Sequence, residues 1–93
     1  MSATLSNGEV QERLAGLDGW SVAGGKLHKD LAFADFNEAF GFLTRLALVA
    51  EKMNHHPDWS SSWNRVTLDI ASHAAGGITQ ACFDLATAAD RLA

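Results

Sequence analysis

The amino-acid sequence predicts one small α+β domain spanning residues 1–93, with the element order α-β-β-α-β-β-α. In this fold, three helices cover one face of a four-stranded antiparallel sheet. The chain length suits one domain. Apolar residues recur at helical spacing in three segments and alternate with polar residues in the segments between them. Strands that alternate in this way bury only one face, which favours an antiparallel sheet with its helices on the buried side.

The first helix is predicted from about Asn7 to Leu17. The run Ser6-Asn-Gly-Glu9 has the form of a capping box, in which side-chain oxygens accept hydrogen bonds from backbone amides at the helix start. Three apolar residues then follow at helical spacing: Val10, Leu14 and Leu17. Gly16 and Gly19 lie where such a helix would end.

A β-hairpin is predicted next. Trp20-Ser-Val-Ala23 is a short alternating segment, and Gly24-Gly25 tolerates the positive φ angles of a tight turn. The second strand is predicted from Lys26 to Ala34, with three apolar residues on one side: Leu27, Leu31 and Phe33. Lys29 interrupts this apolar side, which is typical of an edge or partly exposed strand.

The longest helix is predicted to begin after Asp35, a second capping residue, and to run to about Asn54. Its apolar residues form two neighbouring stripes, which are Phe36, Phe40, Leu43, Ala47 and Ala50 in one and Phe42, Leu46, Val49 and Met53 in the other. Together they are wider than a single core-facing stripe. Either the helix is deeply buried, or one stripe faces the sheet and the other faces a helix of the same or a second subunit.

Two strands and a helix complete the predicted order. Pro57 cannot continue the long helix, and a short strand is predicted from Trp59 to Trp63. The segment from Arg65 to Ser72 alternates most clearly, with its apolar residues on one side: Val66, Leu68 and Ile70. Thr79 is predicted to cap a last helix, whose apolar stripe consists of Ala81, Leu85, Ala88 and Leu92.

The composition argues against several classes of protein. The net charge of −4 lacks the basic excess that is typical of direct nucleic-acid binding. No apolar run approaches the ~20 residues of a membrane span, and Met1–Asn7 does not resemble a secretory leader. We therefore expect a cytoplasmic protein. Cys82 is the single cysteine, so no internal disulfide stabilises this short chain, and oligomerisation is expected instead.

Three of the four histidines lie near the ends of predicted elements, where scaffolds often present functional groups. His55 and His56 follow the long helix, and His73 follows the clearest strand. Histidine serves as an acid or a base near neutral pH because its reference pKa is about 6.5. However, two histidines before a proline are also consistent with an ordinary surface turn.

A metal site formed by these three histidines and Asp58 is an alternative, since zinc accepts such ligands. Against it, the adjacent side chains of His55 and His56 diverge on a helix or a strand, and the sequence lacks the usual short-spaced ligand pairs. We therefore expect no metal. A serine hydrolase has less support, because the sequence contains no G-x-S-x-G turn.

Three segments form a specific combined pattern: Glu51-Lys-Met-Asn-His-His-Pro-Asp-Trp59, Trp63-Asn-Arg-Val66 and Ser72-His-Ala-Ala-Gly-Gly77. Together they resemble the pterin-4a-carbinolamine dehydratases. Trp20 and the run from Phe36 to Arg45 are also similar to that family, so the resemblance covers most of the chain from Trp20 onward.

This resemblance implies the dehydration of a 4a-hydroxytetrahydropterin to a quinonoid dihydropterin in tetrahydropterin recycling, with no metal or organic cofactor. It also implies a homodimer or homotetramer. The implied catalytic residues are His55, His56 and His73. The predicted substrate-binding residues are Glu51, Asn54, Pro57, Trp59, Ala71, Ser72 and Ala74.

Two of these residues have a second interpretation. Glu51 lies one helical turn before His55, where it either raises a histidine pKa and orients the ring or forms an ordinary surface ion pair. Trp59 either packs against the pterin or belongs to the core or its rim. The sequence also departs from the family pattern: Asn54 stands where some members have Asp, and Ala81 and Cys82 replace a basic and acidic pair found in many members.

A non-catalytic protein is the alternative function. It would bind a pterin without turnover, or act as a protein-dimerisation and transcriptional co-activator module, as one animal branch of the family does. The wide apolar arc of the long helix suits such helix–helix contacts. The expected small-molecule partner is a pterin, and no direct nucleic-acid or membrane partner is expected.

Overall fold

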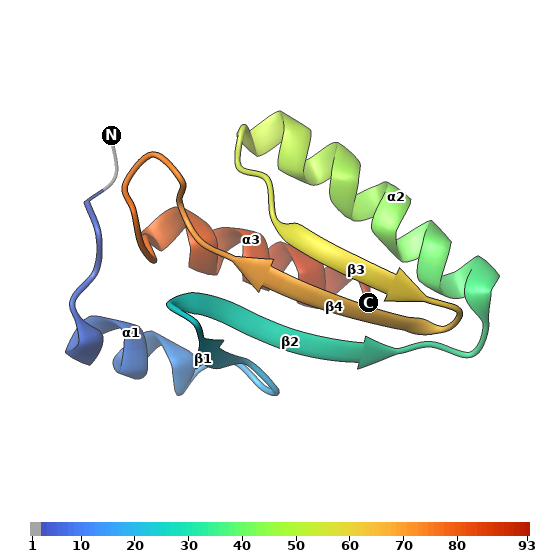
Figure 1. Cartoon of the computed structure of the whole chain (residues 1–93), viewed down its shortest axis with the longest axis horizontal. Coiled ribbons are helices and arrows are strands. Elements are labelled where there is room, and N and C mark those ends of the chain that lie inside the picture. The colour runs from blue at the N-terminus through green and yellow to red at the C-terminus, as the bar shows by residue number, and fades with distance from the viewer. Residues whose placement is uncertain (1–2) are drawn as a thin grey trace.

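The computed structural model describes residues 3–93 and has the predicted order of elements. Its helices are α1 (Asn7–Leu14), α2 (Phe36–Met53) and α3 (Gln80–Leu92). Its strands are β1 (Ser21–Ala23), β2 (Lys26–Ala32), β3 (Asp58–Ser62) and β4 (Arg65–Ile70). All neighbouring strands are antiparallel, in the order β1-β2-β4-β3 (Figure 1). The predicted α+β fold is therefore confirmed.

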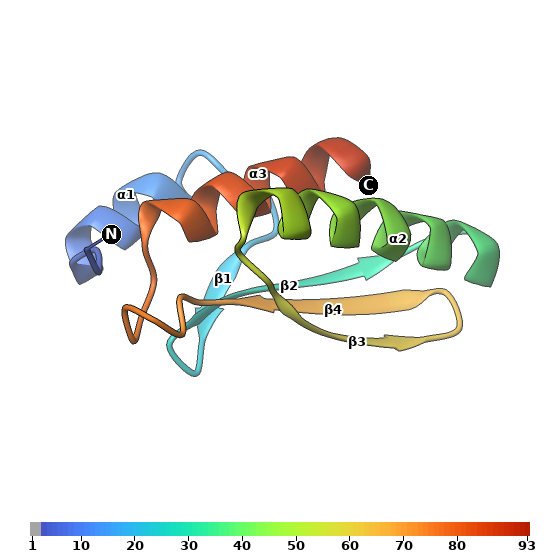
Figure 2. The ribbon, with the colours of Figure 1, turned by 90° about the horizontal axis from the view of Figure 1, so that it is seen from above.

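The three helices lie on one face of the sheet, and the opposite face is open (Figure 2). α2 and α3 pack side by side, and an apolar cluster fills the space between the helices and the sheet. Its fully buried members include Leu27 and Leu68 from the sheet, Phe42 and Leu46 from α2, and Leu85 from α3. Within residues 3–93, no helix has the length and apolar character needed to cross a bilayer.

α1 ends at Leu14, earlier than predicted. Its start has the predicted capping box: Ser6 Oγ accepts a hydrogen bond from the Glu9 amide at 3.2 Å, and Glu9 Oε1 accepts one from the Ser6 amide at 2.8 Å. Beyond Leu14, the amides of Gly16 and Leu17 bond to carbonyls three residues back. This tighter pattern ends the α-helix.

β2 is an inner strand at its start and an edge strand at its end. β1 pairs only with Lys26 to His28, whereas β4 pairs with most of β2. Lys29 interrupts the apolar side of β2, and exposure of its charge to water does not explain this interruption. Its ammonium lies beneath α3, where it pairs with Asp90 at 2.8 Å and lies 5.6 Å from the ring centre of Trp20. The predicted edge or partly exposed strand is confirmed, because β1 does not pair with β2 beyond His28, although the charge of Lys29 itself is paired on the helix-covered side.

α2 presents one face to the sheet, and the interpretation as a deeply buried helix is wrong. Its buried residues are Ala39, Phe42, Leu43, Leu46 and Ala50. Phe36 and Phe40 of the first predicted stripe stack on each other with ring centres 5.7 Å apart, and both are more than half exposed. Ala47 and Leu48 are exposed as well. In the second interpretation, one stripe faces the sheet and the other faces a helix of the same or a second subunit. α2 does pack against α3 of the same chain, and a contact with a second subunit remains a prediction.

The alternation of β4 is confirmed, because Val66, Leu68 and Ile70 are all buried. The strand ends at Ile70 rather than Ser72. The predicted stripe of α3 is confirmed at Leu85 and wrong at its other positions: the buried residues are Cys82, Phe83, Leu85, Ala86 and Ala89, while Ala81, Ala88 and Leu92 are partly exposed. The helix carries alanines on several sides, so their pattern alone does not determine which side is buried.

Candidate active site

The end of α2 turns the chain through a left-handed residue. Asn54 has φ 52° and ψ 41°, a conformation that asparagine adopts more readily than most residues. The next amide, that of His55, donates a hydrogen bond to the carbonyl of Ala50 at 3.0 Å. His55 and His56 therefore follow directly from the last turn of the helix.

The exit of β4 forms a short closed loop. Ser72 pairs with Gly77, and the Ser72 hydroxyl accepts a hydrogen bond from the amide of Ala75 at 3.1 Å. These bonds hold the loop that carries His73 and Ala74. The loop continues from a strand in the interior of the sheet, so its position is fixed by β2 on one side and β3 on the other.

A cavity of about 260 Å³ lies between these two segments. It is lined by Asn54, His55, His56, Ala71, Ser72, His73 and Ala74. The three histidines predicted as catalytic thus border one cavity, together with Asn54 and three residues from the β4 exit. Of the other predicted site residues, Glu51, Pro57 and Trp59 are not among those that line it.

His55 is the most withdrawn from water of the three rings. Its Nε2 atom is buried and has no hydrogen-bond partner among the described residues. Burial lowers the pKa of His55 below its ordinary value, and the neighbouring charges of His56 and His73 lower it further. Near neutral pH the His55 ring is therefore neutral, and a neutral imidazole can accept a proton.

His56 is held differently. Its Nε2 atom lies 2.7 Å from Glu51 Oε1, and both side chains are largely exposed. The contact that the sequence predicted for Glu51 with His55 is therefore made with His56 instead. The chain leaves the helix at Asn54, so the usual spacing of one helical turn no longer applies. A carboxylate in this position orients the ring of His56 at the mouth of the cavity.

Trp59 lies outside the histidine cavity. It pairs with Leu68 in the β3–β4 register, which places it on the helix-covered face at the edge of the sheet. Its side chain is 40% exposed. Its predicted contact with a pterin stays a prediction.

Two further cavities adjoin the first. Some of the residues that line them were not predicted as site residues from the sequence. One, of about 270 Å³, shares His55 and Ser72 with the first and adds Met53, Ala75, Thr79 and Ala81. Another, of about 360 Å³, shares His73 and adds the turn from Gly24 to Lys26. The Gly24-Gly25 pair was recognised as a turn, but its approach to His73 depends on the pairing of β2 with β4.

The two departures from the family pattern on α3 lie in different environments. Ala81 lines the cavity next to His55. Cys82 is fully buried, and its sulfur accepts a hydrogen bond from the Thr79 amide at 3.4 Å. Cys82 thus has a structural position at the start of α3, and a carboxylate there would be buried.

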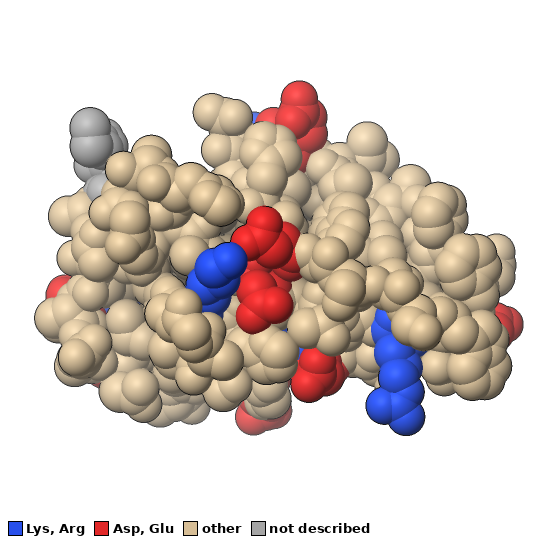
Figure 3. Space-filling model, viewed as in Figure 1, with Lys and Arg blue, Asp and Glu red and all other residues tan. Residues whose placement is uncertain are grey.

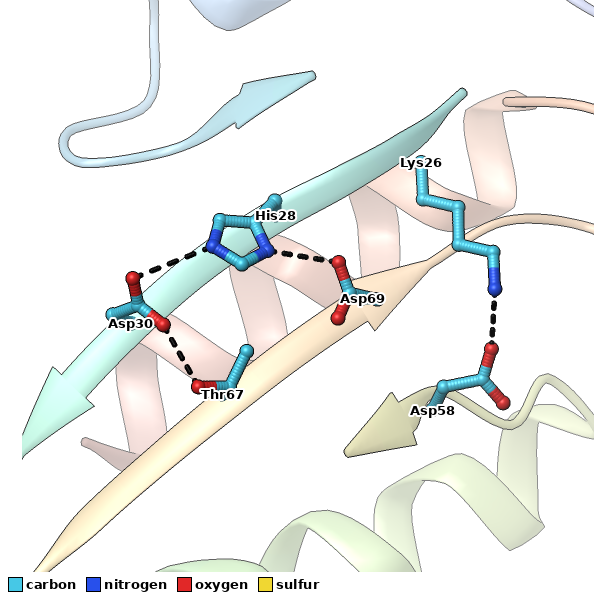
Figure 4. A network of polar contacts seen from close by, with 6 residues as sticks. All are labelled: Lys26, His28, Asp30, Asp58, Thr67 and Asp69. Atoms are coloured by element: carbon cyan, nitrogen blue, oxygen red, sulfur yellow. Dashed lines mark hydrogen bonds and ion pairs between the residues drawn. The ribbon is translucent and has the colours of Figure 1, made fainter. Parts of the chain in front are cut away.

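The open face of the sheet carries a row of polar contacts. Charged side chains on this face gather mainly near its centre (Figure 3). His28 Nδ1 lies 2.8 Å from Asp69 Oδ1, and Lys26 donates to Asp58 at 2.8 Å (Figure 4). The hydrogen bond and charge of Lys26, and more weakly the charge of His73, lower the pKa of Asp58. This row therefore ends beside the histidine cavity.

The site offers proton transfer rather than an evident set of metal ligands. Within residues 3–93, no three or more His, Cys, Asp or Glu side chains are grouped so that they could hold a metal ion. A neutral imidazole and a second imidazole bonded to a carboxylate can accept and donate protons at one small substrate.

Comparisons with known proteins agree with this arrangement. The family model described as pterin 4 alpha carbinolamine dehydratase matches residues 3–92. A relative from Solibacter usitatus is 50% identical over 93 residues, which cover 100% of this chain and 98% of the relative. A relative from Roseiflexus sp. is 41% identical over 92 residues, which cover 99% of this chain and 99% of the relative. Both carry the provisional name pterin-4-alpha-carbinolamine dehydratase.

Two solved structures are similar in fold. The crystal structure of a transcriptional coactivator/pterin dehydratase from Brucella melitensis has a TM-score of 0.93 and 37% identity, covering 97% of this chain and 98% of that one. A pterin dehydratase-like protein described as a RuBisCO assembly factor in the α-carboxysome has a TM-score of 0.65 and 23% identity, covering 78% and 84%. The second similarity concerns the fold alone.

Proposed function

Because the chain belongs to the pterin 4 alpha carbinolamine dehydratase family, we propose that it removes water from a 4a-hydroxytetrahydropterin. The observation that carries this proposal is the single cavity bordered by His55, His56 and His73. The product is a quinonoid dihydropterin, and the reaction serves tetrahydropterin recycling in the cytoplasm.

The chemistry requires two proton transfers and no oxidant. The C4a–O bond breaks, and the hydroxyl leaves as water after it receives a proton from a general acid. The N5–H bond breaks, its proton passes to a general base, and its electrons form the new N5=C4a bond. Well-placed acid and base groups each contribute roughly 10²–10⁴-fold in rate.

The roles follow from the surroundings of each ring. His55 is the base, because it borders the cavity and its lowered pKa keeps the ring neutral. His56 is the acid, since it also borders the cavity and Glu51 Oε1, 2.7 Å from its Nε2, orients the ring. His73 contacts the substrate from the wall formed by the β4 exit.

The test is the rate of dehydration of freshly generated 4a-hydroxytetrahydropterin. His55→Ala and His56→Ala, which remove the proposed base and acid, are expected to lower kcat/KM by about 10²–10⁴-fold each. His73→Ala is expected to lower it through the lost contact with the substrate. His28→Ala is the matched control, because His28 is the histidine on the open sheet face, and it is expected to keep the wild-type rate at a temperature where it is folded. Wild-type protein no faster than buffer would reject the proposal.

A protein-interaction module is the second candidate. It is favoured by the exposed apolar residues Phe36, Phe40 and Leu48 on α2, and the Brucella structure is described in part as a transcriptional coactivator. Wild-type protein that fails to bind any pterin, yet self-associates or binds a partner through α2, would favour this function over the dehydratase.

A further inference from the structure

The loop between β4 and α3 carries His73 on the wall of the histidine cavity. Ser72 and Gly77 pair across the base of the loop, and the amides of Ala75 and Gly76 donate to the hydroxyl and the carbonyl of Ser72. β4 fixes where the loop begins, and these internal bonds fix its shape. Neither determines the angle at which the loop leaves the sheet.

Open space lies on two sides of this loop. The histidine cavity, of about 260 Å³, separates it from the end of α2. A different cavity, of about 270 Å³, lies between the loop and α1, and its lining includes Leu5, Val10, Gly76, Gly77 and Ile78. Close packing usually fixes the position of a segment in a protein. With cavities on two sides, this loop depends more on hydrogen bonds to its surroundings.

Two such hydrogen bonds come from the segment before α1. The Thr4 hydroxyl donates to the carbonyl of Ala75 at 3.2 Å, two residues after His73. The Leu5 amide donates to the carbonyl of Ile78 at 2.9 Å, at the end of the loop. The Thr4 side chain therefore contacts the part of the chain that carries His73.

The segment before α1 is anchored independently of the loop. Ser6 caps α1 through the capping box with Glu9, and Leu5 packs against the hydrophobic core. Arg13 in the last turn of α1 donates to Gln80 Oε1 at 2.6 Å, which joins α1 to the start of α3. Because the donor is held by α1 and the core, its hydrogen bond can fix the position of the loop.

We propose that Thr4 is a positioning residue for substrate binding, whose hydroxyl holds the loop so that His73 borders the histidine cavity. The proposal rests on the proposed dehydratase function. Thr4 does not line that cavity, so it acts through the loop. Without its hydrogen bond, only a fraction of the molecules has the loop in the position that binds substrate, and the apparent affinity falls by that fraction.

The test is the kinetics of Thr4→Val, which keeps the shape of the side chain and removes the hydroxyl. KM for 4a-hydroxytetrahydropterin is expected to rise about twofold to tenfold, the range that corresponds to one neutral hydrogen bond. The value of kcat should stay at that of wild type, because bound substrate holds the loop in place. Thr4→Ser restores the donor and is expected to return KM to the wild-type value.

Thr87→Val is the matched control. The Thr87 hydroxyl also donates to a backbone carbonyl, that of Phe83 at 2.9 Å, but it does so within α3. This variant is expected to leave KM unchanged at a temperature where both variants are folded. An equal rise of KM in Thr4→Val and Thr87→Val, or a loss in Thr4→Val that is confined to kcat, would overturn the positioning role.

A spectroscopic measurement separates this proposal from the proposed function. The imidazole NMR signals of the ligand-free protein require no turnover. In Thr4→Val the signal of His73 is expected to shift or broaden, whereas that of His28 on the open sheet face stays unchanged. If wild-type protein turns over no carbinolamine, the dehydratase function fails, and the His73 signal alone then decides on Thr4. A His73 signal that is the same in Thr4→Val and wild type would overturn the positioning role.

Discussion

At the scale of single residues, His55 is unfavourable for folding. Its buried Nε2 has no partner among the described residues, and a buried polar group without a hydrogen bond costs about 1–3 kcal/mol. Its pKa is lowered in the folded protein, so the unfolded chain binds a proton there more readily. Stability is therefore lost as the pH falls below 6.5, the ordinary pKa of histidine.

His55→Leu separates stability from activity. The variant is expected to lose turnover. Its free energy of unfolding, relative to that of wild type, is expected to rise when the pH is lowered from 8 to about 5.5, because the variant lacks the group whose pKa is lowered by folding. Urea unfolding at the two pH values measures the change. His56→Leu is the control, since the exposed His56 ring already has Glu51 as a partner. A difference between His55→Leu and wild type that is identical at both pH values would contradict this account.

At the scale of elements, β2 and β4 are joined by a histidine between two carboxylates. His28 Nδ1 lies 2.8 Å from Asp69, its Nε2 lies 3.4 Å from Asp30, and Asp30 accepts a hydrogen bond from Thr67 at 2.8 Å. The hydrogen bond with Asp69 is the main cause of a raised pKa at His28. The resulting stability is present below pH 6.5 and is lost as the pH rises through the raised value.

His28→Asn is expected to be less stable than wild type at pH 5.5, by an amount that shrinks when the pH rises to about 9. The pH dependence is opposite in sign to that of His55, because one pKa is raised and the other lowered. Denaturant unfolding at several pH values tests this expectation. Thr67→Val removes an uncharged donor from the same network, so its effect should not vary over this range. A loss of stability in His28→Asn that is the same at every pH would contradict this explanation.

The segment before α1 packs against the loop that carries His73. Leu5 donates its amide to the carbonyl of Ile78 at 2.9 Å, and a Cβ atom at Gly77 would lie 2.8 Å from Thr4 Cγ2. Gly77→Ala is therefore expected to lower the free energy of unfolding by about 1–3 kcal/mol, as overpacking does, and to raise KM. Thr4→Ser removes the clashing methyl group and keeps the hydroxyl. The double variant should regain most of the loss, and no recovery would contradict the steric explanation.

At the scale of the whole molecule, one carboxylate joins three distant segments. Asp90 on α3 accepts a hydrogen bond from Trp20 Nε1 at 3.1 Å and from Lys29 Nζ at 2.8 Å. Lys29 also donates to the carbonyl of Asp18 at 3.0 Å. This cluster ties the segment before β1, the middle of β2 and the last helix into one unit.

Asp90→Ala is expected to lower the free energy of unfolding by about 1–3 kcal/mol, because it leaves the Trp20 and Lys29 donors without their acceptor. Asp84→Ala on the same helix is the control. Asp84 is exposed and pairs only locally with Gln80, so its loss should change stability by at most about 0.5 kcal/mol. Equal effects in the two variants, measured by urea unfolding, would argue against the tying role of Asp90.

The exposed side of α2 leads to a prediction about assembly. Phe36, Phe40 and Leu48 are 53%, 58% and 69% exposed, and a chain of this size gains stability by covering such residues. Sedimentation is expected to show a dimer or tetramer, and Phe40→Lys is expected to shift it toward the monomer. Thr44→Lys, an exposed position one turn away, shows whether any added charge on α2 has the same effect. A wild-type monomer at high concentration would contradict the prediction.

The sequence by itself determined the type and order of the elements, because capping residues, alternation and helical spacing are local properties of the chain. It also predicted His55, His56 and His73 as site residues, through a specific family pattern. Only the tertiary structure decided four other features. They are the buried side of α3, the pairing of Lys29 with Asp90, the partner of Glu51 and the approach of the Gly24–Lys26 turn to His73. Each of these depends on which strands and helices come together, and such contacts leave no local signal when alanines are spread around a helix or a charge is buried in a pair.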